Sequence, residues 1–265
     1  ALCSQMMTNL FIIVLLWSTG QCRGARRRSS NNVQRTEWPG NRYAAGTEAE
    51  CPPSCPTRDL RDARPAARGA LTADQHYAFH ERGFLVLPGL FSAAEVDALS
   101  ATIDSVWRGR RIGRAAARIV ADWFVSTPRE TRGVLREAPD TATAHPLKLN
   151  PLYLDVPAVR GVALDARLSR VLGELLDSRP VLINTLSMNY GTQQKYHFDT
   201  FYMPPPTTNK MVAAWIALDD VDTENGPLRY VPGSHRIRPY RFSTGKLNVV
   251  KNEMRNFSAY IQAEL

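Results

Sequence analysis

The sequence predicts a mainly β domain, a sandwich or barrel flanked by helices. Two observations support this fold class. After Pro180 the apolar residues alternate with a period of two, and before it they recur at helical spacing. Short strands separated by Gly, Pro and Asn turns, following a helical region, are typical of sandwiches and barrels. The four strand candidates cover residues 181–190, 196–203, 211–219 and 228–231.

The helical part begins with two N-terminal capping patterns. Thr72–Gln75 and Ser92–Glu95 both follow the rule that a hydroxyl residue precedes Gln or Glu by three positions. Gly83 is placed to end the first helix, and the apolar run 84–87 is predicted as a strand. An amphipathic helix is predicted over 168–176, ending before Pro180.

The N-terminal quarter differs from the rest in composition. Residues 1–70 hold ten arginines, no lysine, five acidic residues and all four cysteines, so they carry five of the eight net positive charges. The high pI is thus a property of a tail, and a nucleic-acid-binding face on the domain is not indicated. The Arg, Pro, Gly and Ser content of residues 24–69 predicts a disordered linker. We therefore divide the chain into 1–70 and a folded domain, 71–265.

An apolar run lies near the N-terminus, at Leu10–Trp17. Eight residues are far short of the roughly twenty that span a bilayer, but they match the hydrophobic core of a signal peptide. No Lys or Arg precedes the run, and the basic cluster Arg23–Arg28 follows it. A secretory signal and an artefactual N-terminus both remain open, so the localisation is unknown.

The residues that point to chemistry are His197 and Asp199. On a strand, side chains two residues apart point to the same face, so an imidazole and a carboxylate at this spacing can bind one metal ion. This donor pair is part of the 2-His-1-carboxylate triad of non-haem Fe(II) enzymes. The alternatives are a buried His–Asp pair that is merely hydrogen-bonded and a pair of surface residues on a strand.

Several motifs together resemble the phytanoyl-CoA dioxygenase family of Fe(II)/2-oxoglutarate oxygenases. They occur in the family's order and at similar spacing, and the resemblance covers residues 71–265. It implies a double-stranded β-helix, the jelly roll of cupins, with helices packed on its major sheet. The motifs are Leu71–Gln75 with Gly83–Phe91, the His197–Asp199 triplet, Trp215–Leu218, Asn225–Leu228 and Pro232–His235.

The resemblance also implies roles for individual residues. His197 and Asp199 would be the first two iron ligands, and Trp215 would lie beside the co-substrate. Leu186, with Met188, would line the pocket, and Lys148 is similar in position to a lysine that helps to hold 2-oxoglutarate. Core packing for Trp215 and Leu186, and solvation for Lys148, are the plainer alternatives.

The third iron ligand is not evident in the sequence. His235 is the only histidine after Asp199, and in the resembling family this histidine belongs to a turn. The family's distal histidine and co-substrate arginine come from later strands. We therefore expect the last strands of the jelly roll to be missing from this chain.

The resemblance predicts an Fe(II)/2-oxoglutarate-dependent dioxygenase that uses O2 to hydroxylate a small or lipid-like organic substrate. The intact Asp199 favours hydroxylation over halogenation, because related halogenases replace this carboxylate with a small residue. The alternative is a catalytically incompetent fragment, or a non-catalytic jelly-roll module that lacks the distal histidine and the arginine. Neither nucleic acid nor a transmembrane span is expected, and the oligomeric state is unknown.

Overall fold

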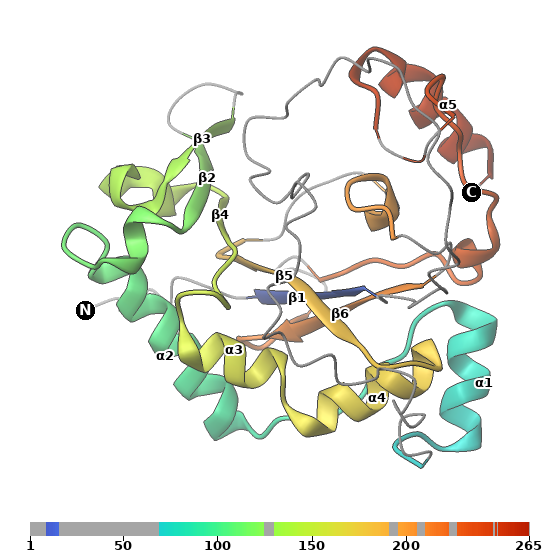
Figure 1. Cartoon of the computed structure of the whole chain (residues 1–265), viewed down its shortest axis with the longest axis horizontal. Helices are drawn as coiled ribbons and strands as arrows, with labels where there is room; N and C mark the ends of the chain where they lie inside the picture. Colours follow the sequence, from blue (N-terminus) through green and yellow to red (C-terminus); the bar gives the residue numbers. More distant parts are fainter. Residues whose placement is uncertain are drawn as a thin grey trace, which may run out of the picture. The chain divides into compact units, whose positions relative to one another are not determined.

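The chain folds into an antiparallel sheet with helices packed against it (Figure 1). The computed structural model describes residues 9–15, 69–124, 130–190, 196–205, 210–222, 227–245, 247 and 249–264, with the backbone alone for 9–15 and 124. Within these ranges the sheet has the strand order β3-β2-β4-β5-β1-β6. The strands are β1 (Asn9–Leu15), β2 (Val120–Phe124), β3 (Glu130–Val134), β4 (Leu147–Asn150), β5 (Val181–Met188) and β6 (Met211–Ala217).

The three predicted helices are confirmed as α1, α2 and α4, and two more, α3 and α5, are present. They are α1 (Ala73–Arg82), α2 (Ala93–Arg108), α3 (Pro157–Ala163), α4 (Ala166–Leu176) and α5 (Met254–Glu264). Thr72 and Ser92 each complete a capping box, in which the hydroxyl accepts from the third helical amide and the side chain there accepts from the cap amide. Gly83 ends α1 with φ of 83°, a left-handed conformation that favours glycine.

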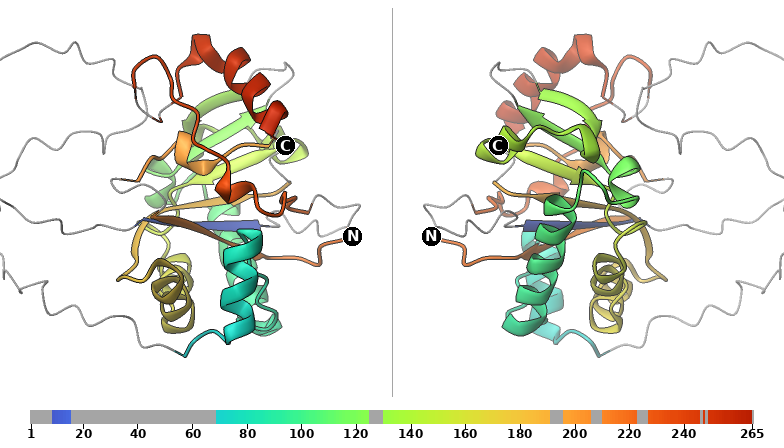
Figure 2. Two further views of the ribbon diagram at one scale, coloured as in Figure 1. Left: turned by 90° about the vertical axis from the view of Figure 1, so that its right-hand side faces the viewer. Right: turned by 90° about the vertical axis from the view of Figure 1, so that its left-hand side faces the viewer.

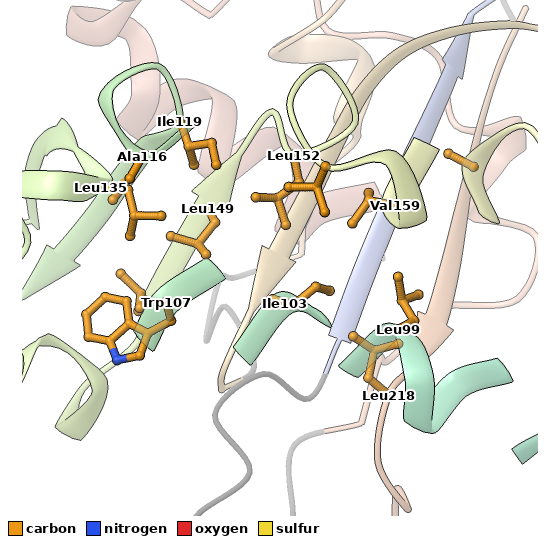
Figure 3. Packing of buried hydrophobic residues seen from close by; sticks show 14 of the residues in the cluster. Leu99, Ile103, Trp107, Ala116, Ile119, Leu135, Leu149, Leu152, Val159 and Leu218 are labelled. Carbon is orange, nitrogen blue, oxygen red and sulfur yellow. The ribbon is translucent and has the colours of Figure 1, made fainter. Parts of the chain in front are cut away.

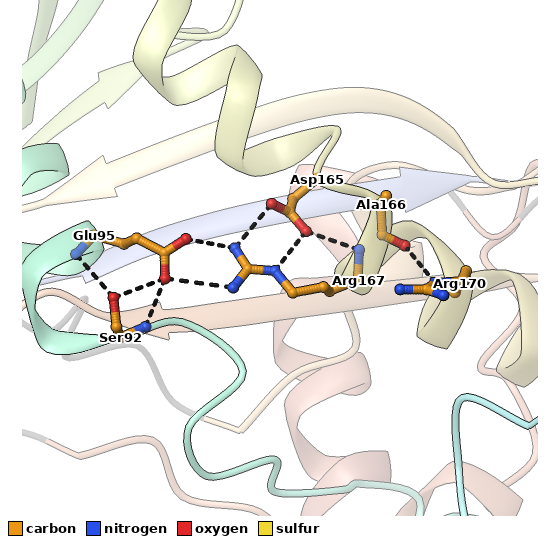
Figure 4. Close-up of polar contacts among 6 residues, drawn as sticks. All are labelled: Ser92, Glu95, Asp165, Ala166, Arg167 and Arg170. Carbon is orange, nitrogen blue, oxygen red and sulfur yellow. Dashed lines mark hydrogen bonds and ion pairs between the residues drawn. The ribbon is translucent and has the colours of Figure 1, made fainter.

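An ion-pair network joins the start of α2 to the start of α4 (Figure 4). The Arg167 guanidinium donates to Glu95 Oε1 at 2.6 Å and to Asp165 Oδ2 at 2.9 Å. Arg167 first, and then the Ser92 backbone amide, lower the pKa of Glu95 to about 2. Asp165, which caps α4, and Glu95, which belongs to the capping box of α2, thus both pair with the Arg167 guanidinium.

The main core lies between the sheet and helices α2 to α4 (Figure 3). Leu99, Ile103 and Trp107 line one face of α2 at helical spacing and are all buried. Their partners on the sheet side include Leu147 and Leu149 of β4, which are fully buried. Helices α2 to α4 therefore cover one face of the sheet, while α5 lies on the opposite side (Figure 2).

Some strand predictions are confirmed and others are wrong. Strands β5 and β6 match the expected strands at 181–190 and 211–219. By contrast, residues 84–87 and 228–231 form no strand, and 196–203 form a bend followed by the 3-10 helix η5, Asp199–Phe201. The sheet is mainly antiparallel with flanking helices, which agrees with the predicted fold class at that level.

The apolar N-terminal run contributes a strand to this sheet. Residues Asn9–Leu15 form β1, which pairs antiparallel with β5 on one side and with β6 on the other. Whether the same residues also act as a targeting signal stays a prediction. Among the helices that the structure describes, none is both long and apolar enough to cross a membrane.

Candidate functional site

His197 and Asp199 approach each other in the turn that leads into η5. His197 Nε2 lies 3.4 Å from Asp199 Oδ1, and the side chains are 23 % and 37 % exposed. The prediction that a strand would bring them to one face is wrong, because Asp199 begins a 3-10 helix. The amides of Tyr202 and Met203 instead donate to the Asp199 carbonyl at 3.0 Å and close the turn that presents its carboxylate.

This separation fits two ligands of a single metal ion. Bonds of about 2.1 Å from one ion to an imidazole nitrogen and a carboxylate oxygen place these atoms about 3 Å apart when the bonds are at right angles. An imidazole and a carboxylate are ligands that suit Fe(II). Over the described part of the chain, no group of three or more His, Cys, Asp or Glu is placed to hold a metal ion.

Two tyrosines adjoin this pair. The Tyr202 ring meets the His197 imidazole edge-on, with centroids 5.5 Å apart and planes at 83°. Partial burial, and then the negative charge of Asp199, raise the pKa of both Tyr202 and Tyr230. Tyr230 also stacks on Phe84, which follows α1, at 5.0 Å. No motif in the sequence marks either tyrosine as a site residue, although Tyr202 lies only three residues beyond Asp199.

An aromatic cluster packs around the phenylalanines of this turn. Phe201 is buried among Phe242 and Phe257, and its ring centroid lies 4.5 Å from that of Phe257 on α5. Phe198 packs edge-on against Phe201 at 5.6 Å. The Val249 amide donates to the Phe201 carbonyl at 3.1 Å. The C-terminal segment thus fixes the position of the residues around Asp199.

The sheet brings Lys148, Leu186 and Trp215 to one face. Leu186 and Trp215 both pair with position 11 of β1, and Lys148 pairs with Met188, two residues beyond Leu186. Residues that pair across a sheet point to the same side, as do residues two apart on a strand. The intervening residues, among them Leu149 and Ile216, pack in the core beneath the helices.

This shared face is therefore the one turned away from α2 to α4. The orange turn of η5 lies on the same side of the sheet (Figures 1 and 2). Lys148 Nζ lies 2.7 Å from Glu130 Oε1 of β3, and its side chain is mostly buried. Asp122 of β2 pairs with Lys148 across the ladder and is also on this face.

His235 lies elsewhere, in the 3-10 helix η6, Ser234–Arg236. Its Nε2 is 2.9 Å from the His80 carbonyl at the end of α1, and its ring packs directly over Gly83. A Cβ at position 83 would collide with this ring, so Gly83 is needed both for its φ and for the close contact. His235 thus connects η6 to α1.

The comparison with protein families agrees with this arrangement. A family model described as phytanoyl-CoA dioxygenase (PhyH) matches residues 79–255, two thirds of the chain. The chain belongs to this family. The match includes the His197–Asp199 turn, β5, β6 and η6.

Individual relatives of this phytanoyl-CoA dioxygenase family member are distant. The bovine phytanoyl-CoA dioxygenase domain-containing protein 1 is 25 % identical over 191 residues, covering 62 % of this chain and 66 % of its own. The zebrafish protein of the same name is 22 % identical with the same coverage. Ectoine dioxygenase of Sphingopyxis alaskensis is 28 % identical over 176 residues, covering 63 % of this chain and 50 % of its own. No solved structure matches the chain significantly.

The chain thus spans at most about two thirds of the length of these relatives. Membership of the family and the dioxygenase names of the relatives make this a chain of a dioxygenase family.

Proposed function

We propose that this chain is the Fe(II)/2-oxoglutarate-dependent oxygenase domain of a hydroxylase that acts on a small or lipid-like organic substrate. The observation that carries the proposal is the 3.4 Å approach of His197 Nε2 to Asp199 Oδ1, within a chain of the phytanoyl-CoA dioxygenase family. We also assign residues 71–265 to this domain and its sheet to a double-stranded β-helix, to which the antiparallel strands and flanking helices are suited.

Metal binding would require a particular protonation state of each proposed ligand. His197 would bind a metal through Nε2 as the neutral imidazole, with its proton on Nδ1. Asp199 would bind as the carboxylate, and by the family resemblance it stands where related halogenases have a small residue that makes room for halide. Together, His197 and Asp199 would hold the ion as two of its ligands. Fe(II) with 2-oxoglutarate and O2 supplies the oxidising power that inserts an oxygen atom into a C–H bond.

The face that carries Lys148, Leu186 and Trp215 is the proposed co-substrate side. The Lys148 ammonium would bind a carboxylate of 2-oxoglutarate by exchanging it for the Glu130 carboxylate, its present partner at 2.7 Å. Trp215 and Leu186, which are aligned through β1, would supply apolar walls that limit water near the metal. These walls would also favour an apolar part of the substrate.

The second candidate is a non-catalytic jelly-roll module. Two donors rather than three come together in the described residues, and two ligands bind Fe(II) weakly. Succinate formation distinguishes the two candidates, because only an oxygenase converts 2-oxoglutarate into succinate and CO2.

The test is turnover of 2-oxoglutarate in air with added Fe(II) and ascorbate, with succinate as the readout. We expect the wild-type chain to form succinate above the metal-free background, and Asp199→Ala to lose at least about 90 % of this rate. Asp97→Ala is the matched control, because Asp97 is exposed on α2 and far from the turn in sequence. If the wild type forms no succinate, the non-catalytic module is the remaining candidate. Equal rates for the wild type and Asp199→Ala would remove Asp199 from the site.

A further inference from the structure

The turn that follows α2 exposes a large apolar side chain. Ile112 is 88 % exposed, more than any other large apolar residue that the structure describes. The amides of Ile112 and Gly113 both donate to the Gly109 carbonyl, at 3.2 and 2.9 Å, and close the turn. Apolar residues that are exposed singly are common on protein surfaces. The side chains around Ile112 therefore decide whether it belongs to a binding surface.

The turn is fixed at both ends. The Arg110 guanidinium is buried over the Trp107 ring, 3.9 Å from its centroid, and donates to the Trp107 carbonyl at 3.1 Å. At the other end, Arg136 donates to the Gly113 carbonyl at 3.0 Å. Ile112 is thus presented to solvent by a backbone that is already ordered, so little conformational entropy is lost when a partner covers it.

Exposed arginines flank Ile112. Residues 108–118 contain five arginines and no acidic residue. Arg110 is the buried one, and the other four are exposed. The exposed arginines are Arg108, Arg111, Arg114 and Arg118. We call these four side chains, together with Ile112, the α2-turn surface.

Carboxylates balance only part of this charge. Those that form ion pairs with the arginines of residues 108–118 are Asp104, Asp140 and Asp155. Glu137 lies against β3 instead, where a Cβ on Gly133 would be 3.1 Å from its Oε2. Six arginines, with Arg136 included, and three carboxylates leave three excess positive charges beside Ile112.

We propose that the α2-turn surface docks on a phospholipid bilayer with anionic headgroups, with Ile112 among the headgroups and the arginines on their phosphates and carboxylates. Excess positive charge next to an exposed apolar side chain is the combination by which proteins bind the interface of an anionic membrane. A nucleic acid offers phosphates to the arginines but no apolar layer to Ile112, whereas a bilayer offers both. One apolar residue and three excess charges make the contact weak and reversible. The proposal does not depend on metal binding.

The experiment measures co-sedimentation of the full chain with vesicles. Vesicles of phosphatidylcholine alone are compared with vesicles of equal parts of phosphatidylcholine and phosphatidylserine. We expect the wild type to bind the mixed vesicles at least about tenfold more tightly, because each excess positive charge adds attraction to the anionic surface. The basic residues at 23–28 are present in every variant, so differences among variants report on the α2-turn surface.

Ile112→Ser should bind the mixed vesicles at least about tenfold more weakly than the wild type, since a large aliphatic side chain is no longer buried. Val86→Ser is the matched control and should bind like the wild type. Val86 is 72 % exposed and precedes α2, whose 16 residues span about 24 Å, whereas Ile112 follows the other end of that helix. Arg114→Gln should weaken binding by about fivefold, and Arg114→Lys, which keeps the charge, should restore it.

Several results would overturn the proposal. One is equal binding of the wild type to both kinds of vesicle, or binding to neither. Another is an Ile112→Ser variant that binds as tightly as the wild type, or a Val86→Ser variant that loses as much, because the α2-turn surface would then not be the contact. The last is a dimer of the wild type, seen by sedimentation without vesicles, that Ile112→Ser converts to monomer, because a second copy would then cover Ile112.

Discussion

The Tyr202 ring stands edge-on to the His197 imidazole, with centroids 5.5 Å apart and planes at 83°. Burial, and then the nearby charge of Asp199, raise the pKa of Tyr202. The Tyr202 side chain therefore contacts one proposed metal ligand, His197, and interacts electrostatically with the other, Asp199. Side chains that orient a ligand in this way affect metal affinity without binding the metal themselves.

Tyr202→Ala should consequently weaken Fe(II) binding by about tenfold, the lower end of what such supporting residues contribute. Tyr202→Phe keeps the ring and should bind Fe(II) within about twofold of the wild type. Anaerobic isothermal titration measures both affinities. If Tyr202→Ala binds as tightly as the wild type, the ring contact does not orient His197.

A second prediction concerns Phe257 on α5, whose ring lies 4.5 Å from that of Phe201. Phe257→Ala should lower the free energy of unfolding by about 3–5 kcal/mol, because it leaves a cavity in a buried aromatic cluster. Urea unfolding measures this change. Fe(II) affinity should fall with it, since the Asp199 turn loses its support. Tyr77→Ala on α1 is the control, because Tyr77 is 70 % exposed and should change stability by less than about 0.5 kcal/mol.

Variants of Lys148 and Glu130 distinguish two roles for Lys148, which are binding of 2-oxoglutarate and formation of a structural ion pair. If it binds 2-oxoglutarate, Lys148→Met should weaken 2-oxoglutarate binding to the Fe(II)-loaded protein by about tenfold or more, the value of a charge-assisted hydrogen bond. Glu130→Gln, which removes the competing carboxylate at 2.7 Å, should strengthen it. Equilibrium dialysis under anaerobic conditions gives both constants. Unchanged affinity in both variants would leave Lys148 with an ion pair worth at most about 1 kcal/mol.

The raised pKa of Asp122 predicts that the stability of the folded chain depends on pH. Burial raises the pKa of this carboxyl, and Glu130 adds to the effect, while Arg132 and Lys148 act in the opposite direction. The folded chain then holds a proton that the unfolded chain has lost, so stability falls as the pH rises from the unfolded pKa of 3.8 through the raised value.

Asp122→Asn removes this titration. The variant should unfold at higher urea concentration than the wild type at pH 7, and the difference should vanish below the unfolded pKa of 3.8. Urea titrations at pH 3, 5 and 7 measure it, with Asp97→Asn as an exposed control. Arg132 Nε lies 3.4 Å from Asp122 Oδ1. A variant that is less stable than the wild type at pH 7 would mean that this ion pair outweighs the cost of burial.

Local signals in the sequence were sufficient for the elements that depend on them. The capping boxes at Thr72 and Ser92 and the left-handed Gly83 each act within one turn of chain, so the ends of α1 and the start of α2 were predictable. Strands β5 and β6 were also predictable, because they are apolar runs that follow Pro180 and the proline run 204–206. The family resemblance, built on several such motifs, is confirmed.

Long-range contacts determine what the sequence did not predict. Residues 196–203 alternate like a strand, but Phe201 packs against Phe242 and Phe257, and this packing accompanies a 3-10 turn. Strands β2 and β3 lie in an arginine-rich stretch without apolar alternation, and β3 exposes Glu130, Thr131 and Arg132. The place of β1 depends on pairing with strands about 170 residues or more away, which no local pattern encodes.

Anaerobic Fe(II) titration tests the claim that His197 and Asp199 bind one metal ion. The wild type should bind about one Fe(II) per chain, and His197→Ala should bind at least about tenfold more weakly. His145→Ala is the matched control, because His145 is an exposed loop histidine, and it should bind like the wild type. Equal binding by the wild type and His197→Ala, or no binding by the wild type, would contradict the claim.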